Sequence, residues 1–157
     1  MADIRFINPE TLAKPPSYTH VVEVSGPCRT VYISGQLGTD RNGDLDRDFR
    51  TQTVQVFENL KAALAAVGAG FKDVVKVNSY LADIGDLPVL REVRAGYLNA
   101  AALPASTTLG GSSFAREGAL LEVEVVAALP ASASRARAKS RTAKRASRKA
   151  KTRGRRK

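Results

Sequence analysis

The sequence predicts an α+β domain, in which a β-sheet carries two helices on one face. With 157 residues, 43% of them hydrophobic and 25% charged, the chain has the length and composition of one globular domain with its own core. Short runs rich in β-branched residues alternate with two stretches of helical periodicity, in the order β-β-α-β-α-β-β. Strands and helices mixed in this way are typical of a sheet with helices packed against it.

Two short β-rich runs come first, at His20–Val24 and Arg29–Ser34. The turn-forming residues 25–28 lie between them, so we expect the two strands to form a hairpin. Residues 35–44 follow and contain three glycines, which predicts a loop.

The first helix is predicted from about Phe49 to Val67. Asp46 and Asp48 precede it, and a carboxylate at this position can accept hydrogen bonds from the free N–H groups of the first turn. Gly68 is expected to end it. The predicted buried stripe comprises Val56, Phe57, Leu60, Ala63, Leu64 and Val67, and the exposed side comprises Gln52, Gln55, Glu58 and Lys61.

Three further strands and a second helix complete the domain. The strands are predicted at Val74–Leu81, Ala105–Leu109 and Leu120–Ala128. Asp86 can begin a helix over Leu87–Ala101, with Pro88 tolerated in the first turn. Its predicted buried face comprises Leu90, Val93, Tyr97 and Leu98. We therefore expect the domain to span residues 1–130.

The charge is divided unevenly between this domain and the rest of the chain. Residues 131–157 contain thirteen Lys and Arg, no Asp or Glu, and no aromatic residue. Residues 1–130 keep twelve basic and fifteen acidic residues, so the body carries −3 and the tail +13. The tail is predicted to be disordered, since it has nothing to bury. It suits non-specific contact with nucleic acid or another polyanion, and the alternative is a solvated tail that promotes solubility.

Several classes of protein are excluded or disfavoured by what the chain lacks. The chain has no run of about 18 apolar residues that would predict a membrane span, and its N-terminus lacks the pattern of a secretory signal. With a single cysteine, we expect the reducing cytoplasm as its compartment. Cys28 is the single cysteine and His20 the single histidine, which excludes an internal disulfide and a Cys/His zinc site. No phosphate-binding loop or dinucleotide motif is present, and we expect neither a cofactor nor a metal.

Several short motifs occur in a familiar order between about Tyr18 and Ala128. They are Ser34-Gly35-Gln36, the N-L-K-A-x-L pattern of 59–64, G-A-G-F-K-D-V-V-K-V at 68–77, Y-L-A-D at 80–83, L-P-A-S-T-T at 103–108 and E-V-E at 122–124. Each is short, but together they cover about a hundred residues, and the chain resembles the RidA/YjgF family.

The resemblance implies a chorismate-mutase-like fold and a homotrimer with three small-molecule pockets between subunits. It also implies cofactor-free hydrolysis of reactive enamines and imines, a deaminase reaction. In the family, backbone around Ser34, Gly35 and Gln36 helps to bind substrate, Glu122 helps to position water, and Tyr18 corresponds to a pocket tyrosine. Without the resemblance, Glu122 is equally well explained as one residue on the polar face of a strand.

The chain differs from the family pattern at one position, where the family has a charged residue. The family has an arginine after Pro-Ala, where it grips the substrate carboxylate, and this chain has Ser106, followed by Thr107. Losing such a charge-assisted bond costs about 2–5 kcal/mol when the partner charge stays buried. The hydroxyl groups of Ser106 and Thr107 suit a neutral ligand better, so we expect weak activity toward imines of amino acids. Arg116 is a candidate replacement cation, although a solvated loop charge explains it as well.

Two alternatives to an imine hydrolase stay open at this point. One is a trimer that binds a small molecule or a protein partner without catalysis. The other is a nucleic-acid-associated protein in which the basic tail of residues 131–157 carries the function and the folded body is a scaffold.

Overall fold

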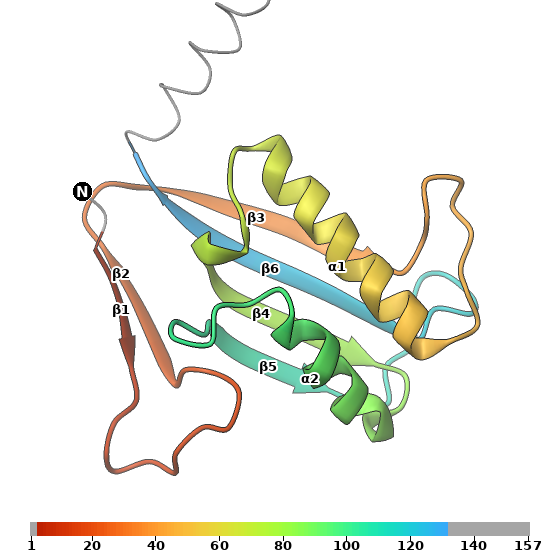
Figure 1. The fold of residues 1–157 in the computed structure, drawn as a ribbon, viewed down its shortest axis with the longest axis horizontal. Helices are drawn as coiled ribbons and strands as arrows, with labels where there is room; N and C mark the ends of the chain where they lie inside the picture. The colour runs from red at the N-terminus through yellow and green to blue at the C-terminus, as the bar shows by residue number, and fades with distance from the viewer. Residues whose placement is uncertain (1–2, 132–157) are drawn as a thin grey trace, which may run out of the picture.

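A four-stranded mixed sheet with the strand order β3-β6-β4-β5 forms the centre of the fold. Its strands carry the candidate site residues Ser34, Gly35, Gln36, Ser106, Thr107 and Glu122. Its strands are β3 (Cys28–Leu37), β4 (Val74–Leu81), β5 (Ala105–Leu109) and β6 (Leu121–Pro130). The helices α1 (Phe49–Ala66) and α2 (Leu87–Ala95) both cover one face of this sheet, as Figure 1 shows. The α+β class predicted from the sequence is therefore confirmed.

The computed structural model describes residues 3–131. The basic tail predicted to be disordered lies, beyond Ala131, outside the described residues, so that prediction and the domain boundary at residue 130 stay predictions. No helix within residues 3–131 has the length and apolar character needed to cross a membrane.

The central strand β6 divides its residues between the two faces of the sheet. Leu121, Val123 and Val125 are at most 2% exposed and pack under the helices. Glu122 and Glu124 alternate with them and therefore lie on the face that the helices leave open. Leu60 and Leu64 of α1 join the buried side, where they are fully enclosed.

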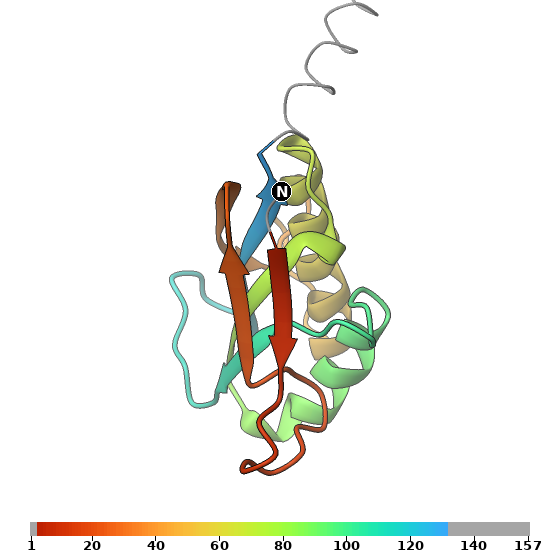
Figure 2. The same ribbon diagram turned by 90° about the vertical axis from the view of Figure 1, so that its left-hand side faces the viewer.

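The predicted hairpin between the first two strands is wrong. β2 (Val21–Ser25) pairs instead with β1 (Asp3–Ile7), a strand the sequence analysis missed, and the two form a separate antiparallel sheet (Figure 2). Within residues 3–131, β6 is the one strand with which β3 pairs. Pro27 has no N–H to give to a ladder, whereas β1 offers β2 five paired residues. The alternation of polar and apolar residues over Asp3, Ile4, Arg5 and Phe6 was the available sign of β1.

Helix α1 begins where predicted, with Asp48 as its N-cap. The backbone N–H and the hydroxyl of Thr51 both donate to the Asp48 carboxylate, at 2.7 and 3.0 Å, and these bonds hold the pKa of Asp48 below its usual value. The C-cap is Val67, and Gly68 follows with a φ of +77°, which glycine adopts without strain.

Gln52 is fully buried, which corrects the prediction that it faces away from the core. Its amide group donates to the carbonyls of Asp46 (2.6 Å) and Gly118 (2.8 Å) and accepts from the N–H of Leu120 (3.0 Å). A polar side chain can be buried at no great cost when its hydrogen bonds are all made. Gln52 thereby ties two loops to the start of α1.

Helix α2 ends at Ala95, earlier than the predicted Ala101. Gly96 is its C-cap, and turns follow. Leu90 and Leu98 are buried as predicted, and Tyr97 stacks on Phe57 of α1 with ring centroids 5.0 Å apart. Short 3-10 turns at η1 (Phe71–Asp73) and η2 (Ile84–Asp86) lead into β4 and α2.

Candidate functional site

A β-bulge interrupts β3 at the Ser34-Gly35-Gln36 motif. The pairing with β6 passes from Ile33↔Val125 to Gln36↔Val123, so Ser34 and Gly35 together oppose a single residue, Glu124. The strand continues to Leu37, so the predicted loop begins later than residue 35. A bulge leaves backbone groups outside the ladder and re-aims side chains, and bulges are common beside active sites.

Glu122 places its carboxylate directly over Gly35. A Cβ added at Gly35 would overlap Glu122 Oε1 and would lie 2.6 Å from Glu122 Cδ. The carboxylate of Glu122 occupies the space that a side chain at residue 35 would fill. It can keep this position because residue 35 is a glycine. Gln36 folds back on the same turn, with its side-chain amide donating to the carbonyl of Ser34 at 3.0 Å.

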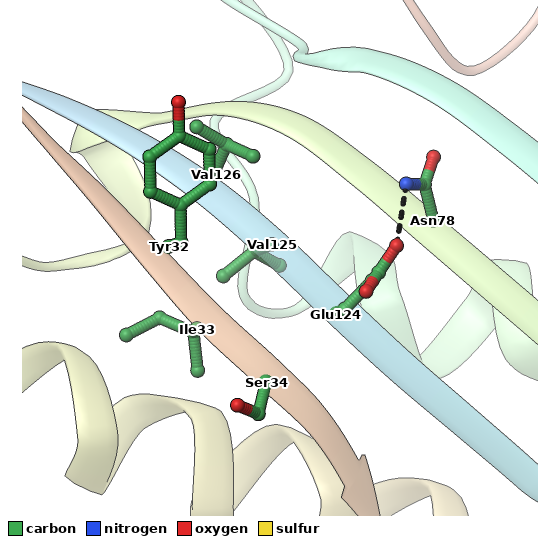
Figure 3. A pocket seen from close by; sticks show the side chains of 7 residues that line it. All are labelled: Tyr32, Ile33, Ser34, Asn78, Glu124, Val125 and Val126. Carbon is green, nitrogen blue, oxygen red and sulfur yellow. Dashed lines mark hydrogen bonds between the residues drawn. The ribbon is translucent and has the colours of Figure 1, made fainter.

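A second carboxylate lies beside the bulge on the open face. Glu124 accepts a hydrogen bond from Asn78 Nδ2 at 2.8 Å, drawn in Figure 3. It also accepts one from the hydroxyl of Tyr80 at 3.2 Å, and both donors lie on β4. Desolvation first, and then the charge of Glu124, raise the pKa of Tyr80. The residues 3–131 contain no cluster of three or more His, Cys, Asp or Glu side chains able to hold a metal ion.

A hollow of about 290 Å³ lies beside Glu124 and Asn78 and has both polar and apolar residues in its lining. Figure 3 shows the lining side chains, which come from β3, β4 and β6: Tyr32, Ile33, Ser34, Asn78, Glu124, Val125 and Val126. Tyr32 is 79% exposed at its rim, the most exposed of the large hydrophobic side chains within residues 3–131. The open face thus combines carboxylates, an amide and an exposed aromatic ring.

Ser106 lies on the other face, under helix α2. Its hydroxyl accepts a hydrogen bond from Arg94 Nη1 at 3.2 Å. Arg94 Nη2 also donates to the carbonyl and the hydroxyl of Ser17, at 3.1 Å each. The segment before β2 lies close to β5 because the N–H of Thr19 donates to the carbonyl of Pro104 at 3.1 Å. The Arg94 guanidinium therefore lies next to Ser106, around which the sequence predicts an uncharged part of the pocket.

Arg94 is only 5% exposed, and none of the ion pairs formed within residues 3–131 involves it. Burial first, and then the charge of Arg91, lower its pKa. Arg94 is absent from the site predicted from the sequence, although its spacing in the chain indicates burial. Leu90, Arg94 and Leu98 lie four residues apart, so a cation falls on the buried stripe of α2.

The remaining predicted site residues are scattered. Thr107 points to the open face, where its hydroxyl accepts a hydrogen bond from Lys76 Nζ at 2.6 Å. Tyr18 packs edge-to-face on His20, with ring centroids 5.3 Å apart. Arg116 lies beside Gly43, in the loops at the far end of the sheet from Ser106, so Arg94 and not Arg116 is the neighbouring cation.

Apart from these scattered residues, the site residues form two groups that do not meet within one copy of the chain. We call Ser34, Gly35, Gln36 and Glu122 the bulge half-site, and Ser17, Arg94 and Ser106 the arginine half-site. β3 and β5 are the opposite edges of the sheet, three strand spacings or roughly 14 Å apart. The two half-sites also use opposite faces, because Ser106 lies under α2 and Glu122 does not.

Comparison with known proteins gives a consistent result. Residues 10–129 match the model of a family described as endoribonuclease L-PSP. A 2-iminobutanoate/2-iminopropanoate deaminase of Dermatophagoides farinae is 32% identical over 111 residues, which cover 69% of this chain and 83% of the relative.

Solved structures agree in fold. A Yersinia pestis protein of the conserved Rid family, described as of unknown function, superposes with a TM-score of 0.72 at 34% identity, covering 80% of this chain and 98% of that one. RidA from an Antarctic Psychrobacter gives 0.60 at 35% identity, with 80% and 99% covered. The order of motifs, the bulge with its carboxylate and these matches lead to one conclusion: the chain belongs to the RidA/YjgF family.

Proposed function

We propose that the protein hydrolyses a small imine or enamine without a cofactor, with Glu122 as the catalytic residue. The observation that carries the proposal is the position of the Glu122 carboxylate over Gly35. Gly35 belongs to a β-bulge, where the regular pairing of β3 with β6 is interrupted. Relatives named 2-iminobutanoate/2-iminopropanoate deaminase support the reaction class.

The chemistry needs one base and a group that polarises the imine. Glu122 accepts a proton from a water molecule, whose oxygen then attacks the C=N carbon of the protonated imine. In the resulting carbinolamine the glutamic acid passes its proton to the amino nitrogen, the carboxylate takes up the hydroxyl proton, and the C–N bond breaks to give a carbonyl compound and ammonia. An enamine enters the same path after protonation at carbon. Backbone N–H groups at Ser34 and Gly35 are suited to hold an oxygen of the substrate.

The pocket in this proposal is completed by a second copy of the chain. The bulge half-site and the arginine half-site lie on opposite edges and faces of one sheet, so a ligand can touch both only across a subunit boundary. This separation supports the homotrimer with interfacial pockets that the family resemblance implies. A solution mass of 16.8 kDa, that of one chain, would contradict it.

The first test compares the full chain with its Glu122→Gln variant on 2-iminobutanoate released in place by an amino-acid oxidase. We expect the wild type to hydrolyse the imine faster than the uncatalysed blank. The variant should lose roughly 100-fold or more in kcat, because an amide has no basic oxygen to take the proton of water. The disappearance of imine is followed directly, and 2-oxobutanoate binding is measured in parallel.

The same measurements separate catalysis from binding alone. Saturable binding of 2-oxobutanoate without turnover, unchanged in Glu122→Gln, would show a ligand-binding protein and not a hydrolase. Turnover that Glu122→Gln leaves intact would remove Glu122 from the mechanism.

A second candidate function, binding of nucleic acid or another polyanion, rests on the charge of residues 131–157. Thirteen Lys and Arg without a single acid give a local charge of +13 on a body of −3. Each phosphate contact releases counterions, so binding of this kind is strong at low salt and indifferent to base sequence. In an oligomer, several tails act together and raise the avidity.

Truncation after Pro130 tests this candidate. We expect the full chain to bind short RNA and DNA duplexes with an affinity that falls roughly 1,000-fold between about 50 and 200 mM salt, as for six or more phosphate contacts. The truncated chain should lose this binding, and a chain with every tail Lys and Arg changed to Gln should behave like it. Binding that survives truncation would assign the interaction to the folded body.

A further inference from the structure

Arg94 is a buried cation whose partners are all neutral. Its three hydrogen bonds reach the hydroxyl of Ser106 and the hydroxyl and carbonyl of Ser17, and its side chain is 95% enclosed. Taking a guanidinium out of water is expensive unless a negative charge compensates it. Among residues 3–131 no carboxylate forms an ion pair with it, and the charge that acts on its pKa is that of a second cation, Arg91.

We propose that Arg94 binds the carboxylate of the substrate, so that the ligand is a small imino or oxo acid and not a neutral imine. This inference rests on the proposed function, which it deepens by naming the substrate class. The guanidinium reaches the Ser106 wall from α2 instead of from β5, and the cation lost from residue 106 is thereby supplied by a residue twelve positions earlier.

The local chemistry favours a carboxylate over other anions. A guanidinium presents parallel N–H groups that match the two oxygens of a carboxylate, and two of its five donors are not used by Ser17 or Ser106. The two serine hydroxyls can each add one neutral hydrogen bond. One cation with two hydroxyls balances a single negative charge, whereas a phosphate dianion would leave a charge unmatched.

Arg94 also changes what is expected of residue 106. A second guanidinium introduced there would lie within reach of Arg94 Nη1, which is now 3.2 Å from Ser106 Oγ, and the two cations would repel each other. Ser106→Arg alone is therefore expected to weaken carboxylate binding. Combined with Arg94→Met, the same change returns a single cation to the wall.

The test measures equilibrium binding of 2-oxobutanoate to the full chain, with butanone as the uncharged probe of the same skeleton. We expect butanone to bind roughly 10- to 100-fold more weakly, as for loss of a charge-assisted hydrogen bond. Arg94→Met should lose the same factor for 2-oxobutanoate and nothing for butanone. Arg91→Met is the matched control on the exposed side of α2 and should keep the wild-type preference.

The double variant Arg94→Met with Ser106→Arg should recover most of the lost affinity, which a merely structural role of Arg94 would not allow. Equal affinity of the wild type for 2-oxobutanoate and butanone would overturn the proposal, and so would a Met variant that keeps the preference. Inorganic phosphate is tested as a competitor of 2-oxobutanoate. A higher affinity for phosphate than for 2-oxobutanoate would overturn the choice of a carboxylate. Should Arg94→Met fail to fold, the wild-type comparison of the two probes still decides.

Binding and turnover fail separately in this design. A preference for the acid that depends on Arg94, without imine hydrolysis, leaves this inference standing and removes the proposed function. Hydrolysis that depends on Glu122 but is unchanged in Arg94→Met removes the inference and leaves the function.

Discussion

Replacing Gly35 by alanine is expected to remove imine hydrolysis at least as completely as replacing Glu122 itself. The added methyl group would occupy the space of the Glu122 carboxylate, with Cδ 2.6 Å and Cγ 2.8 Å from the new carbon. The glutamate must then turn away from the bulge, and the base loses its place beside the substrate. We expect kcat to fall roughly 100-fold or more, since a general base acts only within hydrogen-bond reach.

Gly70→Ala is the matched control for this change. A Cβ at Gly70 meets nothing within 4 Å, and its φ of −150° is extended backbone that any residue adopts. Thermal unfolding of both variants shows whether the fold survives. A folded Gly35→Ala protein with wild-type turnover would contradict the role given to the bulge half-site.

Replacing Gln52 by leucine is expected to destabilise the fold by about 2–4 kcal/mol. The change leaves the carbonyls of Asp46 and Gly118 and the N–H of Leu120 without their partner in a partly buried place. Each backbone group that loses its hydrogen bond costs on the order of 1 kcal/mol or more. Urea unfolding should show a lower midpoint with an unchanged slope.

Gln55→Leu, one turn further along the same helix, provides the comparison. Its side chain makes one hydrogen bond, to Asn59 Oδ1 at 2.8 Å, and Asn59 keeps its own bonds to the carbonyls of Leu37 and Thr39. We expect a change within about 0.5 kcal/mol. An equal decrease in the free energy of unfolding in the two variants would mean that the hydrogen bonds of Gln52 add no more stability than the single bond of Gln55.

Local pattern was sufficient to predict the elements of the central sheet. Val74–Leu81 and Ala105–Leu109 are strands with the predicted bounds, and α1 begins at Phe49 as expected. Pairing was not predictable to the same degree. β2 follows the rules of a hairpin in its sequence, but whether it pairs with β1 or β3 depends on a competition between distant partners.

The candidate site divides in the same way. The sequence predicted Gly35 and Glu122 as members of one site, and the structure places them in contact. Arg94 was missed because a charged residue on a helix is ordinarily expected to face solvent. Its burial depends on Ser17 and Ser106, which lie 77 and 12 residues away in the chain, and no window of sequence shows that meeting.

β6, the last strand of the domain in the sequence, provides the hydrogen-bonding edges with which β3 and β4 pair. β6 lies between β3 and β4, and the pairing of Cys28 with Pro130 joins two residues about a hundred positions apart in the chain. During synthesis, β3 and β4 therefore wait with unpaired edges until residue 130 is available. A topology dominated by such distant pairings folds slowly, and the growing chain is most vulnerable to association in the interval before β6 arrives.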